Sequence, residues 1–313
     1  MDHKTKNNLH NLRLSWLSVM IIIASLVVGT ISWMTWINYQ KGLAFKPTGK
    51  IAFKCSPGWP DICISNADGT GLNQITGRSD RSSDSHTWSN DGKKIAFVAD
   101  PLSIFQPALF IINVDGSNKR QIVKPDVDSA LGSLSWSPDG IHILFTKQVF
   151  NYNAKKGKSY SLFIVNSEDL TMRQLTQSVA SDRGYWSPDG YLIVYSRTQY
   201  DAIAGTSQSN IFVIKPDGSD ERLLTQRNGY SPSWSPDGKK IAFVDYPIST
   251  MARGERRIYI VNIDGSGEKM LADVNSDSPL WSPDGIRIAF TCSQDSKGGI
   301  CVINNDGTGL ILL

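Results

Sequence analysis

Apolar and polar residues follow one another along this chain in a block that recurs. Its clearest copy, Trp-Ser-Pro-Asp-Gly-Lys-Lys-Ile-Ala-Phe, runs from Trp234 to Phe243. A shorter copy with Phe in place of Trp runs from Phe45 to Phe53. The apolar triplets that end the copies start at 51, 95, 143, 193, 241 and 288. A period of about 40–50 residues is typical of a propeller blade or a solenoid unit. Other close copies begin at Trp88, Trp136, Trp186 and Trp281.

The unit that begins at Trp234 predicts four short strands joined as a meander. Pro236-Asp237-Gly238 is typical of a tight turn, because Pro presets φ, Asp bonds nearby backbone and Gly tolerates positive φ. Apolar strands are expected at 241–244 and 258–261, and the Asp264-Gly265 pair that follows is typical of a hairpin. Both middle strands are apolar throughout, which predicts a sheet covered on both faces.

The other units predict the same elements, although unit three has Glu168-Asp169 without a Gly at its hairpin. Six such sheets packed face to face around an axis would leave no long open edge. The predicted fold class is therefore all-β, a six-bladed β-propeller of four-stranded blades spanning residues 42–313. Second apolar strands are expected at 62–64, 109–112, 162–165, 211–214 and 300–303, and further hairpin turns at Asp68-Gly69, Asp115-Gly116, Asp217-Gly218 and Asp306-Gly307.

The repeat also carries a family resemblance. WSPDGKKIAF followed by IYIVNIDGSGEKML resembles the TolB-type propeller repeat, which also occurs in the propellers of prolyl oligopeptidase-like peptidases. The resemblance covers residues 42–313, and it implies the fold far more specifically than a function, since one architecture hosts many activities. It implies a role in protein contacts at the cell envelope. TolB-type proteins carry an α/β domain and a cleaved signal before the propeller, where this chain has an apolar run.

That apolar run predicts a membrane anchor. Residues 14–37 contain no charged side chain, and about 20 apolar residues span a bilayer as a helix. Trp16 lies near one end, and Trp33 and Trp36 near the other, as expected of aromatic belts. We therefore predict a cytoplasmic segment 1–13 and one N-terminal transmembrane signal-anchor helix at 14–37. A cleaved signal peptide is the alternative, which the length of the run and its bulky end disfavour.

The four cysteines lie at repeat-equivalent positions. Cys55 and Cys292 each follow an apolar triplet, and Cys63 and Cys301 each enter the next strand. Neighbouring strands bring Cα atoms within disulfide reach, which predicts the pairs Cys55–Cys63 and Cys292–Cys301. Four buried free thiols are the alternative, and the spacing disfavours a zinc site. Disulfides indicate an oxidising compartment. We therefore expect a single-pass membrane protein whose propeller lies on the extracytoplasmic side, periplasmic or extracellular.

Charge and composition narrow the function. A net charge of +3 is far from the footprint of a nucleic-acid-binding protein, so no nucleic-acid partner is expected. The turn aspartates recur in every good copy, which favours bonding to their own turns over calcium. The motif tryptophans recur likewise and are expected to pack between blades. No cofactor and no metal is predicted.

Candidate binding residues fall in two groups. In the meander, the WSPDG turns and the Asp-Gly hairpins lie on one face, and the variable loops lie on the other, where binding usually occurs. Tyr246, Arg256 and Arg257 belong to one of these loops. Aromatics and Arg are typical of binding hot spots, although isolated surface side chains and water-filled channels are the plainer readings. The loop candidates are Trp59, Phe105, Phe150, Tyr152, Tyr200, Met251 and Arg253; the channel-mouth candidates are Asp84, His86, Asp182, Arg183, Tyr230 and Asp277.

These features predict a non-catalytic scaffold that binds a protein or peptide at the cell envelope, with residues 14–37 in the membrane. A channel-sited enzyme is the first alternative. The Gly-x-Ser-x-Gly elbow of a hydrolase is missing from the sequence, and His86 and His142 are the only propeller histidines for a channel metal site. A small-ligand or glycan sensor that uses the channel is the second alternative.

Overall fold

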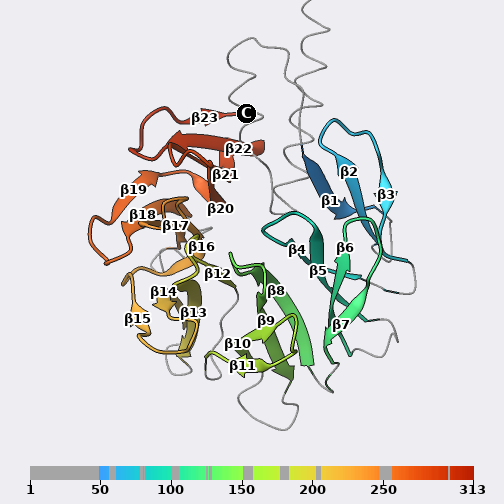
Figure 1. Ribbon diagram of the computed structural model, residues 1–313. Coiled ribbons are helices and arrows are strands. Elements are labelled where there is room, and N and C mark those ends of the chain that lie inside the picture. Colours follow the sequence, from blue (N-terminus) through green and yellow to red (C-terminus); the bar gives the residue numbers. More distant parts are fainter. Residues whose placement is uncertain are drawn as a thin grey trace, which may run out of the picture.

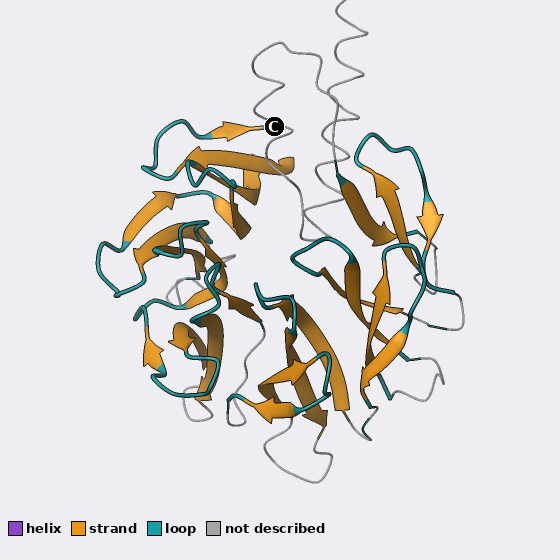
Figure 2. Cartoon of the chain, viewed as in Figure 1, coloured by secondary structure: helices purple, strands orange, loops and turns teal. Residues whose placement is uncertain are grey.

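The described part of the chain forms six antiparallel sheets around a central axis (Figure 1). The computed structural model describes residues 49–55, 61–77, 80, 82–100, 106–124, 126, 129–150, 158–176, 183–201, 206–246, 256–294 and 297–313. Figure 2 shows these residues as strands and loops alone. The predicted all-β, six-bladed propeller is confirmed.

Each sheet is one blade, built from consecutive strands in chain order. Blade I has three described strands, and each of the other blades has the predicted four. Blade I contains β1 (Lys50–Lys54), β2 (Ile62–Asn66) and β3 (Asn73–Gln74); blade II contains β4 (Ser82–Trp88), β5 (Lys94–Ala99), β6 (Ala108–Asn113) and β7 (Arg120–Val123); blade III contains β8 (Ser129–Trp136), β9 (His142–Phe150), β10 (Lys158–Asn166) and β11 (Met172–Gln174). Blade IV contains β12 (Gly184–Trp186), β13 (Ile193–Asp201), β14 (Thr206–Ile214) and β15 (Arg222–Leu223); blade V contains β16 (Gly229–Trp234), β17 (Lys240–Asp245), β18 (Arg257–Asn262) and β19 (Lys269–Ala272); blade VI contains β20 (Asn275–Trp281), β21 (Arg287–Gln294), β22 (Lys297–Asn304) and β23 (Ile311–Leu312).

The recurring turn holds itself together through its own side chains. The Ser235 hydroxyl donates to Oδ1 of Asp237 at 2.6 Å, and the same oxygen accepts the amide of Lys239 at 3.1 Å. These hydrogen bonds hold the pKa of Asp237 below its usual range. Gly238 follows with φ +68°, a conformation that favours glycine. The turn aspartates therefore bond their own turns, as predicted. The same Ser–Asp bond forms in Ser89–Asp91, Ser137–Asp139, Ser187–Asp189 and Ser282–Asp284.

The hairpin of blade III lacks Gly and is stabilised differently. Leu170 takes the left-handed conformation there, with φ +63°. Oδ1 of Asn166 accepts the amide of Glu168, and Oδ1 of Asp169 accepts the amide and hydroxyl of Thr171. Side-chain bonds to the backbone thus support a conformation that a non-glycine residue rarely adopts.

Neighbouring blades share apolar cores. Five clusters join blades I–II, II–III, III–IV, IV–V and V–VI in turn. The indole N–H of Trp234 donates to the carbonyl of Tyr185, and that of Trp281 to the carbonyl of Ser233, each in the preceding blade. The motif tryptophans therefore pack between blades, as predicted. Within the described ranges no cluster joins blade VI to blade I, and Ala289, Ile300 and Val302 form a group of blade VI alone.

A cation at the start of most outer strands reaches the next blade. Each such side chain donates to a carbonyl in the hairpin region of the following blade, which links the perimeter of the ring. In β23, the last outer strand, the position that corresponds to these cations is occupied by the uncharged Ile311. The donor–acceptor pairs are Arg120–Ser167, Arg173–Pro216, Arg222–Ile263 and Lys269–Asp306.

Both predicted disulfides are present. The Cα atoms of Cys55 and Cys63 are 5.7 Å apart, and those of Cys292 and Cys301 are 5.8 Å apart. Cys63 pairs with Phe53 and Cys301 with Phe290 across their strands. In blades II–V an aromatic residue takes the position of Cys63 and stacks on its cross-strand aromatic neighbour. These ring pairs are Phe97–Phe110, Phe145–Phe163, Tyr195–Phe212 and Phe243–Tyr259.

The predicted transmembrane segment, residues 14–37, lies outside the described residues, as does segment 1–13. In the part of the chain that the structure describes, no helix has the length and hydropathy needed to cross a bilayer.

Candidate binding site

The described residues place one group of the predicted candidates together, at the inner ends of blades V and VI. Tyr230 lies near the start of β16, and Asp277 lies in β20. Strands β16 and β20 are the innermost strands of their blades and contact each other. Tyr246 directly follows β17 and Arg256 directly precedes β18, so both lie on the variable-loop face. We call Tyr230, Tyr246, Arg256 and Asp277 the mouth cluster.

An ion pair forms the centre of the mouth cluster. Arg256 Nη1 donates to Asp277 Oδ2 at 2.5 Å, and the guanidinium lies 6.0 Å from the ring centroid of Tyr230. The rings of Tyr230 and Tyr246 meet edge to face, with centroids 6.4 Å apart. The side chains of Arg256 and Asp277 are 42% and 32% exposed. The cluster therefore offers a partner an aromatic surface beside an Arg with further donors, a combination typical of hot spots.

The backbone beneath the mouth cluster is irregular. The pairing of β16 with β17, and that of β20 with β21, each contain a bulge. Within the bulges Ser231 has φ +50° and Ser278 has φ +54°. Asp277 Oδ1 accepts the amide of Ser278 at 2.7 Å, which holds the carboxylate toward Arg256. Blade III has the same bulge, with Ser133 at φ +48°, so the irregularity belongs to the repeat; in blades V and VI it sets the direction of the side chains beside it.

A second ionic group lies next to the mouth cluster in the chain, because Asp245 directly precedes Tyr246. Arg227 donates to Asp245 at 3.2 Å and to Glu268 at 2.5 Å, and its guanidinium lies 4.0 Å from the ring centroid of Tyr259. Asp245 is 4% exposed, and this burial raises its pKa although Arg227 opposes the shift. Arg227 and Glu268 were not predicted as site residues. The cation over this ring recurs in blades II–IV, as Lys119 over Phe110, Lys147 over Phe163 and Arg197 over Phe212.

The surroundings of Tyr230 keep its phenol protonated at neutral pH. Burial raises the pKa of Tyr230 to about 12, with Arg256 opposing the shift and Asp277 adding to it. At neutral pH the phenol is therefore a neutral donor, whereas a general acid or base works best with a pKa near the operating pH. Among the described residues, no group of three His, Cys, Asp or Glu side chains is placed to hold a metal ion.

The other predicted residues that the structure describes lie in blades II, III and IV. Arg183, beside β12, is exposed, and Phe150, the last residue of β9, is partly exposed. Asp84 belongs to β4, and Tyr200 belongs to β13 opposite Ser207. The remaining candidates, Trp59, Phe105, Tyr152, Asp182, Met251 and Arg253, lie outside the described residues.

His86, predicted at the channel mouth, lies at the joint of blades I and II. It pairs with Phe97 across β4 and β5. Burial lowers the pKa of His86; the backbone of Ala52 opposes the shift, and the charge of Lys54 adds to it.

We expect this histidine to make the fold sensitive to acid. Unfolded His titrates near pH 6.5, so as the pH falls below that value the unfolded chain takes up a proton that folded His86 resists. The free energy of unfolding therefore decreases from about pH 6.5 down to the lowered folded pKa. Urea unfolding at pH 7 and pH 5 should show a smaller pH effect for His86→Gln than for the wild type. His142→Gln, which keeps His86, is the control; equal pH effects in wild type and His86→Gln would contradict the assignment.

Comparisons with known proteins agree with the architecture. The family model of the TolB beta propeller domain matches residues 20–230, more than half of the chain. A TolB homolog of Chlorobium luteolum is 28% identical over 155 residues, which are 49% of this chain and 31% of that protein. The chain thus matches about a third of that relative's length.

Solved structures with the same fold include an enzyme as well as a TolB protein. TolB from Acinetobacter baumannii is 21% identical, with a TM-score of 0.61, over 87% of this chain and 65% of that one. Oligogalacturonate lyase from Vibrio parahaemolyticus is 15% identical, with a TM-score of 0.66, over 84% of this chain and 74% of that one. At these identities the likeness shows the fold alone. From the repeats, the six sheets and the family match together, the chain belongs to the TolB β-propeller domain family.

Proposed function

We propose that this chain is a membrane-anchored, extracytoplasmic propeller that binds a protein or peptide partner at the cell envelope without catalysing a reaction. The observation that carries the proposal is the mouth cluster, where two tyrosines flank a partly exposed Arg256 on the variable-loop face. The TolB homolog and the TolB structure among the similar proteins support the envelope setting.

The chemistry of the mouth cluster suits an extended polypeptide. Tyr246 is 36% exposed and presents an aromatic surface. Arg256 uses one donor on Asp277, and its guanidinium has others for backbone carbonyls or a carboxylate. The amide of Ser278 already holds the Asp277 carboxylate toward Arg256. A partner that inserts an aromatic or acidic side chain beside Arg256 would therefore require little rearrangement of the mouth cluster.

Photo-crosslinking in cells tests partner binding. A photoreactive residue at Tyr246 should capture one partner, whereas the same residue at Tyr191 should not, because Tyr191 is 75% exposed in the β12–β13 turn, at the opposite end of the strands from the β17–β18 loop. Capture that is equal from both faces would contradict a binding site at the mouth cluster. Crosslinks from Phe150 then show whether the partner also reaches blade III.

Replacing Arg256 by alanine should weaken binding of this partner at least about tenfold, or about 1.4 kcal/mol of binding free energy. Truncation of a hot-spot residue typically costs more binding free energy than that. The measurement is the dissociation constant of the captured partner with the purified full chain. Lys239→Ala removes one exposed cation from the turn face and is the matched control. An unchanged affinity of the Arg256→Ala variant for the partner would show that the mouth cluster is not the binding site.

The anchor is tested separately. The full chain should stay with membranes after alkaline extraction, and deletion of residues 14–37 should release it. Protease added outside intact cells or spheroplasts should cut the propeller if it is extracytoplasmic. A channel-sited enzyme or a small-ligand sensor remains a distinct outcome: turnover of a saccharide, or saturable binding of one by purified protein that lacks a polypeptide partner, would replace the scaffold proposal.

A further inference from the structure

The two disulfides occupy the same position of the repeat but different surroundings. Cys292 and Cys301 are 5% and 1% exposed, and both belong to the core shared with blade V, beside Val244 and Ile258. Blade V therefore covers this disulfide. Pairing of β21 with β22 also continues beyond it, to Gln294 and Lys297.

The Cys55–Cys63 disulfide lies at the end of its hairpin. Pairing of β1 with β2 stops at Lys54 and Ile62, one residue before Cys55. Cys63 is 3% exposed, whereas Cys55 is partly exposed and is the most accessible of the four cysteines. No described strand of blade VI shares a core with this blade. The difference between the disulfides thus follows from their place in the order of blades: one lies inside the core shared by blades V and VI, and the other lies in blade I, which shares no described core with blade VI.

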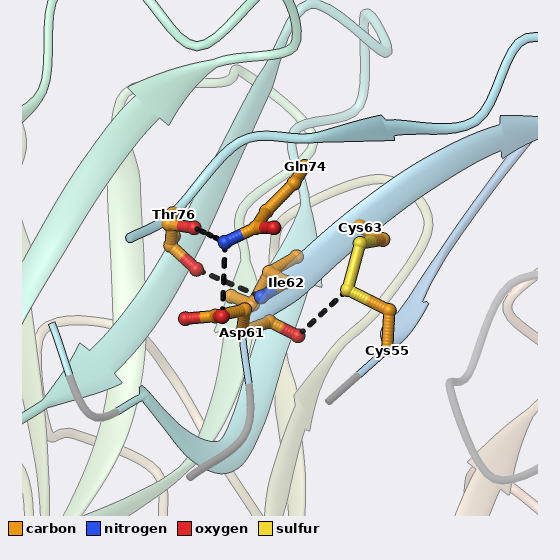
Figure 3. The surroundings of a disulfide bond; sticks show 6 residues. All are labelled: Cys55, Asp61, Ile62, Cys63, Gln74 and Thr76. Atoms are coloured by element: carbon orange, nitrogen blue, oxygen red, sulfur yellow. Dashed lines mark hydrogen bonds between the residues drawn. A yellow bond between two sulfur atoms is a disulfide. The ribbon is translucent and has the colours of Figure 1, made fainter. Parts of the chain in front are cut away.

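The hairpin end around Cys55 has supports of its own (Figure 3). The amide of Ile62 donates to Thr76 Oγ1 at 2.7 Å, and Gln74 Nε2 donates to Asp61 Oδ2 at 2.9 Å and to the carbonyl of Thr76 at 2.8 Å. The amide of Cys55 donates to the carbonyl of Asp61 at 3.1 Å. These bonds do not require a disulfide, because blade III, which has Phe163 in place of Cys63, makes the equivalent bonds from Leu162 and Gln174 to Thr176. Blade I can therefore hold both redox states.

We propose that Cys55–Cys63 is a thiol–disulfide exchange site for protein or small-molecule dithiols, attacked at Sγ of Cys55, and that Cys292–Cys301 is a permanent crosslink. Exchange needs a thiolate to approach one sulfur from outside, so access decides which disulfide reacts. This inference does not depend on the proposed function.

The step balances with the dithiol as the reductant. Its thiolate bonds to Cys55 Sγ, the Cys55–Cys63 bond breaks, and the electron pair leaves on Cys63 Sγ, which takes a proton from water. The second thiol of the reductant, after losing its proton, attacks its own sulfur in the mixed disulfide and releases Cys55 as a thiolate. The protein gains two electrons and the dithiol becomes a disulfide.

Graded reduction of the full wild-type chain tests the proposal. The protein is equilibrated with increasing dithiothreitol, free thiols are alkylated, and the four cysteines are quantified by mass spectrometry while tryptophan fluorescence reports folding. We expect Cys55 and Cys63 to be half-reduced at a dithiothreitol concentration at least about tenfold below that for Cys292 and Cys301, with the fluorescence unchanged. Equal concentrations, the reverse order, or reduction of Cys55–Cys63 only as the fluorescence changes would overturn it.

The attacked sulfur is identified with a monothiol. Glutathione cannot complete the second step within one molecule, so a mixed disulfide accumulates. The adduct is expected on Cys55, and an adduct mainly on Cys63 would contradict the assignment. Cys63→Ser, which leaves Cys55 without its partner, should be alkylated at Cys55 with no reductant present and serves as the control for accessibility; Cys55 that resists alkylation in this folded variant would also overturn the proposal.

Discussion

Replacing Phe243 by alanine should lower the free energy of unfolding by about 3–5 kcal/mol, the range for a large aromatic side chain removed from a core. Phe243 is fully buried in the joint between blades IV and V, and its ring stacks on Tyr259 at 5.8 Å. A side chain at Gly229 would lie 3.1 Å from the same ring, so the surroundings are tightly packed. Urea unfolding of the full chain, followed by tryptophan fluorescence, gives the value.

Tyr191→Ala is the control for Phe243→Ala. Tyr191 is 75% exposed in a turn, so its loss should change the free energy of unfolding by less than about 0.5 kcal/mol. A cost below about 1 kcal/mol for Phe243→Ala would show that blades IV and V do not share the core described above.

Removing the Cys292–Cys301 disulfide by the double substitution Cys292→Ala, Cys301→Ala should lower the free energy of unfolding by about 2–4 kcal/mol. The crosslink closes a short loop, with a sequence separation of 9, so the loss of chain constraint is moderate. Both sulfurs are buried against blade V, and their removal also leaves a gap in that joint. The measurement is urea unfolding without reductant.

The matched variant is Cys55→Ala, Cys63→Ala. Its loop has a similar separation, 8 residues, but Cys55 is partly exposed, so less packing is lost and the cost should be smaller. A larger cost for this pair would contradict the account that blade V buries the Cys292–Cys301 disulfide and leaves the other one accessible.

The site was predictable only in part, for a physical reason that particular residues show. Tyr230 and Asp277 were identified because the strand before each WSPDG turn is innermost in a propeller. Arg227 and Glu268 were missed, since Arg227 lies between blades outside the repeated motif, Glu268 lies in the repeated hairpin segment, and 41 residues separate them. Their pairing depends on how the chain between blades IV and V lies against the outer strand β19, which no local pattern encodes.

The sequence by itself determined the strands, the turns, the number of blades and the cysteine pairs. The strands, turns and cysteine pairs depend on contacts within one turn or one hairpin, such as Ser235 with Asp237 or Phe53 with Cys63, and the number of blades follows from the number of repeats. Only the tertiary structure decided that Arg256 meets Asp277 from the next blade and that one disulfide is covered while the other is accessible. Those outcomes depend on which blade lies against which, a property of the arrangement of sheets around the axis rather than of any single repeat.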